Sequence, residues 1–454
     1  MGFINREEEL KLIKSNLGEG GLIIVYGRRR IGKTELLKQI KFSSIYYLVK
    51  EQSLGKTLDE LNNKFIKKFN DLSLLDNPLD EFRKIFKYLA DKRVVLILDE
   101  FPLLLKYEGV LGHLQEFLDA KPKTAIILCG SYISAMEKIK DYSSPIYGRR
   151  MFSLKLQAIK FKYLKEFFPK LKKEELAKIY GVLGGVPEYL LKYSGNFDKF
   201  IKENFFKKDT YLYEDAELLL RYELRDLSVY NSILKSISSG ATTLNEIAQK
   251  SFVEKNIIVQ YIDTLIGLDI IKKEFPYLAG KGDRLKERGA LYFIRDNYFN
   301  FYYNFVYPYK EDINLGYADK VLKYFKRDFS SYMGFIFEEE AREFLADKFK
   351  INFGRQWGKY KVNEDGKIVN KAYEIDLLSY DEDKKEIIAF EVKWNDNIDY
   401  KKGAKILREL DGKLKYLPLD LKSCKMKIGI VAMNIKDKNK FKKEGFFVFD
   451  LRDM

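Results

Sequence analysis

The spacing G-x-x-x-x-G-K-T, which supplies the residue types needed to hold phosphate, occurs at Gly27, Gly32, Lys33 and Thr34. Glycines let backbone N–H groups turn toward phosphate oxygens. Lys33 would neutralise the β- and γ-phosphates of a nucleotide, and the Thr34 hydroxyl would bind Mg²⁺. The positions between the two glycines, which would also lie against the nucleotide, are Arg28, Arg29, Arg30 and Ile31.

A strand and a helix must flank such a loop to position it. Residues 22–26, Leu-Ile-Ile-Val-Tyr, predict a short buried strand, and the segment after Thr34 has the apolar spacing of an amphipathic helix. The positive end of that helix would point at the phosphates. This strand, loop and helix order is the context that a phosphate-binding loop requires.

Two acidic residues follow another apolar strand, residues 94–98. Asp99 and Glu100 come at its carboxyl end, the edge where open α/β sheets bind ligands. We expect Asp99 to bind Mg²⁺, directly or through water, and Glu100 to polarise the attacking water; a structural ion pair is the alternative. A third buried strand, Thr-Ala-Ile-Ile-Leu-Cys-Gly-Ser, ends at Ser131, which would sense the γ-phosphate.

Two arginines, Arg149 and Arg150, close the segment Ser-Pro-Ile-Tyr-Gly-Arg-Arg. One of them could act as an arginine finger on the transferred phosphate, in cis or from a neighbouring subunit. The second arrangement would require a homo-oligomer. The alternative is a pair of ordinary surface arginines.

A second group of acidic residues lies near the C-terminus, in Tyr373–Trp394. If this segment forms a hairpin centred on Asp-Glu-Asp-Lys-Lys-Glu, Asp376 lies opposite Glu391 and Glu374 lies opposite Lys393. Alternation then places Ile375, Leu377, Ile388, Phe390, Val392 and Trp394 on one core face and the four charged residues on the other. Facing carboxylates repel each other unless a cation lies between them.

An upstream helix adds Glu338, which is in helical register with Ala341 and Leu345 and should point inward. Glu338, Asp376 and Glu391 with Lys393 would suit a site that binds Mg²⁺, activates water and stabilises a phosphodiester transition state. An exposed strand face with ordinary ion pairs is the alternative.

Composition limits the remaining chemistry. The chain has 454 residues, two cysteines and one histidine, too few for a disulfide framework or a Cys/His zinc site. Lys and Arg exceed Asp and Glu by 82 to 67, a net charge of +15, which favours a polyanion such as nucleic acid as partner. We find no apolar run of about 18 residues, so we expect no membrane insertion and a cytoplasmic location.

The order of motifs resembles the archaeal ATPase family, a branch of P-loop ATPases in the AAA/STAND group. The resemblance rests on Phe-Ile-Asn-Arg-Glu-Glu-Glu-Leu at 3–10, the loop 27–34, Leu-Ile-Leu-Asp-Glu-Phe-Pro, Leu-Cys-Gly-Ser-Tyr-Ile-Ser-Ala-Met, the arginine segment, and Gly-Gly-Val-Pro-Glu-Tyr-Leu at 184–190. It implies ATP as the nucleotide, Asn5 and Arg6 near the adenine, and a helical lid that carries the 184–190 turn.

The acidic hairpin resembles the PD-(D/E)XK nuclease superfamily. Glu338 matches its helical acid, Asp376 its metal-binding aspartate, and Glu391-Val392-Lys393 its E-x-K motif, with Ile375 in place of the motif's proline. The resemblance implies an α/β fold and a metal-dependent nuclease site, whose activity the fold alone does not guarantee.

Between these regions, residues 226–310 show three helical patterns and two short strands, which together predict a winged helix. Thr243 and Glu246 form a capping-box pattern before the second helix. The basic segment Lys281–Arg288 would form the wing tip and contact DNA; a protein-docking module is the alternative.

We therefore predict an α/β multidomain protein with a parallel-sheet P-loop ATPase core at 1–156, a helical lid at 157–225, a winged helix at 226–310 and a nuclease-like domain at 311–454. The predicted function is ATP hydrolysis with Mg²⁺, coupled to action on nucleic acid. A non-cleaving, ATP-switched regulator with an inactive nuclease fold is the alternative.

Overall fold

The computed structural model describes residues 4–17, 20–364, 367–394 and 397–454, which form two compact units. Unit 1 contains Met1–Ile159, Gly185–Lys192 and Glu217–Arg225. Unit 2 contains Lys160–Gly184, Tyr193–Ala216 and Asp226–Met454. The chain therefore passes between the units five times, after residues 159, 184, 192, 216 and 225.

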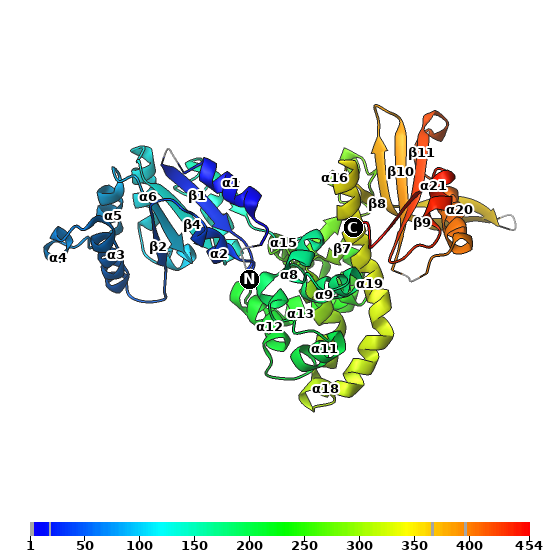
Figure 1. The fold of residues 1–454 in the computed structure, drawn as a ribbon, viewed down its shortest axis with the longest axis horizontal. Helices are drawn as coiled ribbons and strands as arrows, with labels where there is room; N and C mark the ends of the chain where they lie inside the picture. Colours follow the sequence, from blue (N-terminus) through cyan, green and yellow to red (C-terminus); the bar gives the residue numbers. More distant parts are fainter. Residues whose placement is uncertain (1–3, 18–19, 365–366, 395–396) are drawn as a thin grey trace. The chain divides into compact units, whose positions relative to one another are not determined.

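Unit 1 is built on a parallel sheet of five strands in the order β2-β3-β4-β1-β5 (Figure 1). The strands are β1 Gly21–Tyr26, β2 Ser44–Leu48, β3 Val95–Asp99, β4 Ala125–Gly130 and β5 Arg150–Lys155. Because all strands are parallel and in register, the ends of β1, β3 and β4 meet at one edge of the sheet. This confirms the predicted parallel α/β sheet.

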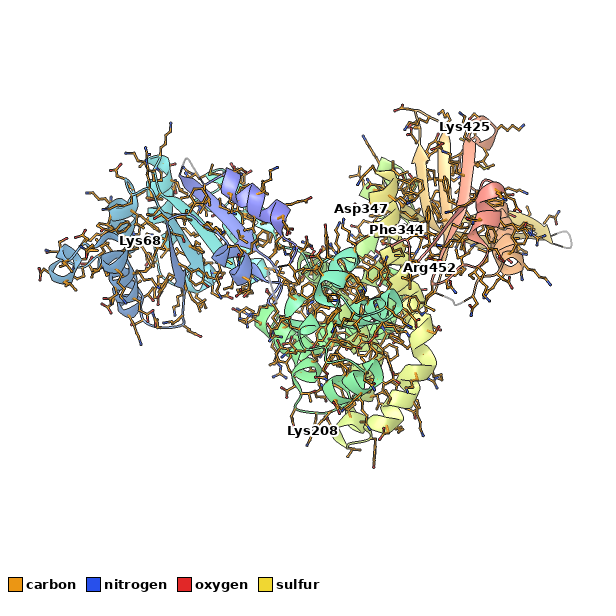
Figure 2. All side chains as sticks on the ribbon, in the orientation of Figure 1. Lys68, Lys208, Phe344, Asp347, Lys425 and Arg452 are labelled. Carbon is orange, nitrogen blue, oxygen red and sulfur yellow. The ribbon has the colours of Figure 1, made fainter. Side chains whose placement is uncertain are left out.

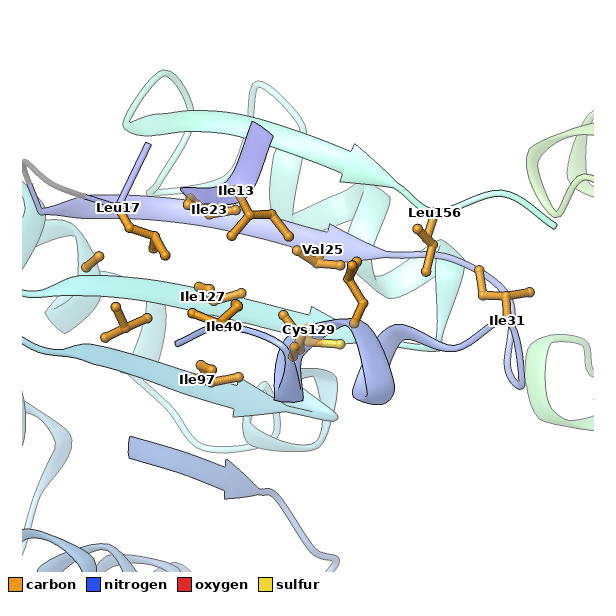
Figure 3. Close-up of a cluster of buried hydrophobic side chains, with 14 residues drawn as sticks. Ile13, Leu17, Ile23, Val25, Ile31, Ile40, Ile97, Ile127, Cys129 and Leu156 are labelled. Atoms are coloured by element: carbon orange, nitrogen blue, oxygen red, sulfur yellow. The ribbon is translucent and has the colours of Figure 1, made fainter. Parts of the chain in front are cut away.

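Apolar side chains fill both faces of this sheet. Ile23, Val25, Ile97, Ile127 and Cys129 pack together on one face, with residues of α1 (Glu7–Ser15) and α2 (Lys33–Lys38) against them (Figure 3). The alternate strand residues are equally buried: Leu22, Ile24, Leu96, Leu98, Ile126 and Leu128. Burial on both faces explains why these strands are continuously apolar in the sequence.

The other helices of unit 1 are α3 Leu54–Phe69, α4 Ser73–Asp76, α5 Phe82–Leu89, α6 Val110–Asp119, α7 Ile133–Lys140 and α10 Pro187–Leu190, with the 3₁₀ turn η1 Phe101–Leu104. His113, the single histidine of the chain, lies in α6. Helix α12, Tyr211–Glu223, begins in unit 2 and ends in unit 1.

The N-terminal part of unit 2 is mainly helical. It contains η2 Phe161–Tyr163, α8 Leu164–Phe167, α9 Lys173–Leu183, α11 Phe197–Phe205, α13 Leu227–Ser238, α14 Leu244–Ser251, α15 Lys255–Gly267, α16 Lys281–Leu285, α17 Asn297–Phe301, the turns η3 Tyr302–Val306 and η4 Tyr307–Tyr309, and α18 Lys310–Asn314. Strands β6 Ile271–Glu274 and β7 Leu291–Ile294 form an antiparallel pair. The capping box of Thr243 and Glu246 is confirmed at the start of α14.

Helix α19, Ala318–Phe349, runs for 32 residues and carries a buried stripe on one side. Phe325 in this stripe packs against Phe301, Phe305 and Phe329, with ring centroids 4.6–5.8 Å apart. Figure 2 marks Phe344 and Asp347 near its C-terminal end, where the helix reaches the second sheet. A single helix therefore joins the aromatic core to the C-terminal strands.

The second sheet has the order β12-β11-β10-β9-β8. Its strands are β8 Gly354–Glu364, β9 Lys367–Asp381, β10 Glu386–Lys393, β11 Lys425–Ala432 and β12 Phe447–Asp450, with α20 Tyr400–Leu414, η5 Leu421–Ser423 and α21 Lys438–Lys443 between them. The first three strands are antiparallel and the last pairs are parallel. The separate C-terminal α/β sheet that the sequence predicted is thus present.

The predicted face assignment of the acidic hairpin was partly wrong. The pairing of β9 with β10, Leu377 opposite Phe390, agrees with the predicted register. However, β9 has one extra residue between Ile375 and Leu378 relative to β8, which is a β-bulge. Ile375 therefore shares a core with Leu378 and α20, whereas Phe390 packs against aromatic rings on the α19 side.

Candidate functional site

The loop Gly27–Thr34 leaves the carboxyl end of β1 and enters α2. Gly27 has φ 145°, and a Cβ there would lie 2.6 Å from the carbonyl oxygen of Leu156. Gly32 has φ 92° directly before the helix. Both positions require glycine because of their left-handed backbone, and at Gly27 also because of the close carbonyl.

Lys33 is buried and curls back into this loop. Its Nζ donates to the carbonyl oxygens of Gly27 and Arg28, both at 2.8 Å. Burial lowers the pKa of the ammonium, and the nearby carboxylates of Glu100 and Asp99 act in the opposite direction. The loop therefore holds a concentrated positive charge in a site with little solvent.

Asp99 lies at the end of β3, beside the start of α2. The Thr34 hydroxyl donates to Asp99 Oδ2 at 2.8 Å, and the Tyr46 hydroxyl of β2 donates to the same oxygen at 2.6 Å. Burial, together with the bond to Asp99, raises the pKa of Tyr46. Hard oxygen donors from Thr34 and Asp99 thus lie side by side, a donor set that suits Mg²⁺. Tyr46 was not anticipated from the sequence.

Glu100 adopts the left-handed conformation, with φ 57°, which directs its side chain toward the end of β4. The Ser131 hydroxyl lies 2.7 Å and 3.0 Å from its two carboxylate oxygens. The structure therefore brings Ser131 and Glu100 together at the predicted edge of the sheet.

Residues 185–192 lie against the same loop, within unit 1. Arg28 donates to the Tyr189 hydroxyl at 3.2 Å, and Arg30 lies 3.6 Å from Glu188. The backbone at Gly185 is so close to its neighbour that a Cβ would lie 1.7 Å from the carbonyl oxygen of Ile159. The 184–190 turn is thus held against the phosphate-binding loop.

Arg29 has different neighbours, from the end of α12. Its guanidinium carbon lies 3.4 Å from the centroid of the Tyr222 ring, and its Nε donates to Ser131 Oγ at 3.3 Å. The adjacent Glu223 accepts hydrogen bonds from the Ile133 N–H at 3.0 Å and the Ser134 hydroxyl at 2.9 Å. Burial raises the pKa of this carboxyl. Sequence reasoning missed Tyr222 and Glu223, which carry no local motif.

The two arginines predicted as candidate fingers lie elsewhere. Arg149 forms a two-bond pair with Asp119, at 2.6 Å and 3.1 Å, and Arg150 donates to the carbonyl oxygen of Lys140. Arg150 pairs with Leu22, at the start of β1. The phosphate-binding loop begins five residues later, about 16 Å along the strand. The structure thus contradicts the in-cis role, and the role in a neighbouring subunit stays a prediction.

Arg6, which the family resemblance places near the adenine, is buried beside the loop. It donates to the carbonyl oxygens of Gln157 at 2.6 Å and Ile31 at 3.3 Å. Asn5 precedes it with φ 48°. Phe3 of the same motif lies outside the described residues.

The second group of charges lies inside β9 and at the carboxyl end of β10. Asp376 sits in the bulge of β9, and its Oδ2 accepts a hydrogen bond from the Val392 N–H at 2.7 Å. Lys393 Nζ lies 2.8 Å from Glu391 and 3.6 Å from Asp376. Lys413 of α20, which sequence reasoning missed, lies 3.0 Å from both oxygens of Glu391.

Electrostatics couple these groups. Burial raises the pKa of Asp376, and the nearby Glu391 raises it further. Burial would lower the pKa of Lys393, but Asp376 and Glu391 together raise it. The result is two carboxylates that share the charges of two ammonium groups, Lys393 and Lys413.

Glu338 interacts electrostatically with Asp376 and Lys393, but its ion pair is with another residue. Its carboxylate bonds to the Arg355 guanidinium, which also lies 3.2 Å from Glu374. Burial raises the pKa of Glu338 to about 7, and Asp376 contributes. Over the described ranges, no three His, Cys, Asp or Glu side chains converge on one point. Glu338 is thus paired with Arg355, and its place in one site with Asp376 and Glu391 stays a prediction.

Among the helices of the described ranges, none has both the length and the apolar character that a bilayer crossing needs.

Comparisons with known proteins agree with this architecture. A family model described as an ATPase domain predominantly from Archaea matches residues 3–193, and one described as archaeal and bacterial proteins of unknown function matches residues 302–406. The uncharacterized protein MJECL04 of Methanocaldococcus jannaschii is 34% identical over 429 residues, covering 92% of this chain and 93% of its own length.

Two further matches concern a shorter segment and the fold. The uncharacterized ATP-binding protein MJ0423 of the same organism is 48% identical over 52 residues, which are 10% of this chain and 88% of that protein. The solved Walker-type ATPase PABY2304 of Pyrococcus abyssi has a TM-score of 0.50 at 22% identity, covering 66% of this chain and 95% of that chain. This last match shows a shared P-loop ATPase fold.

Proposed function

Because the chain belongs to the archaeal family that includes MJECL04 and has an archaeal ATPase domain over residues 3–193, we propose that it binds and hydrolyses ATP at the loop Gly27–Thr34. One observation supports this most directly. Thr34 and Asp99, 65 residues apart, are hydrogen-bonded at the edge where β1 and β3 end, and Lys33 lies next to them. A phosphate-binding loop and a second acidic strand end are the two parts that P-loop hydrolysis requires.

Thr34 and Asp99 would hold Mg²⁺, which supplies charge neutralisation at the phosphates when it is bound. The loop N–H groups and Lys33 hold the β- and γ-phosphate oxygens. Glu100 accepts a proton from the attacking water, whose oxygen forms a bond to the γ-phosphorus. The bond from that phosphorus to the β,γ-bridging oxygen breaks, so ADP and phosphate are the products. Arg6 and Asn5 are proposed to lie beside the adenine.

The test uses the full chain. Lys33→Ala should abolish ATP binding measured by calorimetry, because it removes the charge that faces the phosphates. Glu100→Gln should retain binding and reduce turnover by about 100-fold or more, because it removes only the group that takes the proton. Normal turnover in the Glu100→Gln protein would refute the assigned role, and nucleotide binding by Lys33→Ala would refute the site.

A second candidate function, cleavage of nucleic acid, is favoured by the Asp376, Glu391 and Lys393 arrangement. We propose that residues 311–454 form a nuclease-like domain whose two carboxylates bind a divalent cation, with Lys393 facing the phosphodiester. The bulge that re-aims Asp376 supports this, since bulges are frequent next to active sites. Metal-dependent cleavage of DNA by the full chain would support it; a chain that binds DNA without cleaving it would favour the regulator alternative.

We also propose that α13, α14, α15, β6 and β7 form the predicted winged helix, and that DNA is its partner. Residues 281–289, at its tip, are all exposed and include four basic side chains. The net charge of +15 supports a polyanion partner.

A further inference from the structure

Three consecutive arginines in the phosphate-binding loop have three different environments. Arg28 contacts Tyr189, and Arg30 contacts Glu188. Arg29 is hydrogen-bonded to Ser131, and Ser131 in turn donates to Glu100 at 2.7 Å. The guanidinium of Arg29 is therefore two hydrogen bonds from the carboxylate that is proposed to take the proton from water.

The Tyr222 ring packs against the Arg29 guanidinium. The guanidinium carbon lies 3.4 Å from the ring centroid, a cation–π contact. The Tyr222 ring packs edge-on against Tyr132, with centroids 5.5 Å apart, and the next residue, Glu223, bonds to the start of α7. The ring is thus fixed to the same segment, 131–134, that follows β4 and carries Ser131.

These contacts are weaker than those that a phosphate offers. A cation–π contact contributes about 0.5–2 kcal/mol, whereas an arginine can bind phosphate oxygens through two parallel charged hydrogen bonds. A γ-phosphate bound at the loop would therefore compete successfully for the guanidinium. The neutral Ser131 hydroxyl would not retain it.

We propose that Arg29 is this chain's own catalytic arginine: it contacts the γ-phosphate oxygens as charge develops on them, with Tyr222 and Ser131 as positioning residues. The inference rests on the proposed ATPase function and replaces the in-cis role first expected for Arg149 or Arg150. It also explains how a single chain has an arginine near Glu100 without a contribution from a neighbouring subunit.

The experiment measures kcat and the dissociation constants of ADP and of ADP–aluminium fluoride, a mimic of the transferring phosphate, on full-length variants. Arg29→Ala should lower kcat by about 1,000-fold, the lower end of the range for arginine fingers. It should weaken ADP–aluminium fluoride binding by a similar factor and change ADP affinity less than threefold. Arg29→Lys should recover little, because lysine lacks the planar fork. Arg83→Ala, a surface arginine paired with Glu116, is the matched control and should behave as wild type.

The positioning role of Tyr222 is tested by comparing the change in kcat with the change in ADP affinity. Tyr222→Leu should lower kcat about tenfold with unchanged ADP affinity, and Tyr222→Phe, which keeps the ring, should restore it. Equal ADP–aluminium fluoride affinity in wild type and Arg29→Ala would overturn the inference alone. Absence of turnover in wild type would overturn the proposed function, and the role of Arg29 with it.

Discussion

Glu340 is buried in α19 without a hydrogen-bond partner for either carboxylate oxygen among the described residues. It lies two residues after Glu338, on a different side of the helix. Burial, reinforced by the nearby Glu343, raises its pKa well above the ordinary value of 4.5. Tyr180 of α9 is also buried there, and Glu340 is among the groups that raise its pKa. The folded protein therefore holds the proton of this carboxyl to a higher pH than the unfolded chain does.

The sign and size of the effect follow from this difference. The folded state binds one proton more than the unfolded state, so the free energy of unfolding falls as pH rises. The loss is about 1.4 kcal/mol per pH unit for as long as the folded carboxyl stays protonated. Glu340→Gln removes the titration but keeps the shape. Its stability relative to wild type should therefore rise between pH 5.5 and pH 7.5, by at most about 1.4 kcal/mol per pH unit.

Urea unfolding of the full chain, followed by tryptophan fluorescence, measures this difference. Both tryptophans, Trp357 and Trp394, lie in unit 2 with Glu340, so the signal reports the relevant unit. Glu409→Gln, an exposed position on α20 paired at 3.9 Å with Lys405, is the control, and its stability should follow that of wild type over the whole pH range. A pH-independent difference between wild type and Glu340→Gln would refute the reasoning, because it would mean that the carboxyl ionises alike in both states.

Two further predictions concern unit 2. Mn²⁺ at a hundredfold excess over its dissociation constant should stabilise the full chain by about 2.7 kcal/mol in a melting experiment. The Asp376→Asn variant should lose this stabilisation, and the Lys393→Ala variant should retain it. If Mn²⁺ does not shift the melting temperature of wild type, the metal site is ruled out. The logarithm of the DNA affinity should fall linearly with the logarithm of the salt concentration. The slope should decrease when the basic residues of the wing, Lys281, Arg284, Lys286 and Arg288, are neutralised. An unchanged slope would indicate a protein-docking module.

Local patterns were sufficient to predict the parallel sheet, the phosphate-binding loop and the positions of Asp99 and Glu100, because each depends on a strand and the few residues after it. Tyr46, Tyr189 and Tyr222 reach the site from β2, α10 and α12. Tyr189 lies in the 184–190 motif, but no local motif marks Tyr46 or Tyr222, since only the tertiary fold brings their segments to the loop.

The two errors have a similar cause. Arg150 follows a family-like segment, but it begins a parallel strand and so lies at the edge opposite to the loop. The extra residue in β9 breaks the alternation of side chains, and nothing in the apolar sequence around Asp376 indicates it. Both depend on where a strand starts or slips relative to its neighbours.

The five passages of the chain between the two units limit how the gene can be divided. A shortened chain that starts at Asp226 would lack Lys160–Gly184 and Tyr193–Ala216, so buried residues of α9 and α11 would be missing from the unit that needs them. A shortened chain that ends at Ile159 would lack Tyr189, Tyr222 and Glu223, which hold the arginines of the loop and the start of α7. Neither unit can therefore be expressed as a complete fragment of continuous sequence. A gene fusion or recombination event would have to exchange both units together.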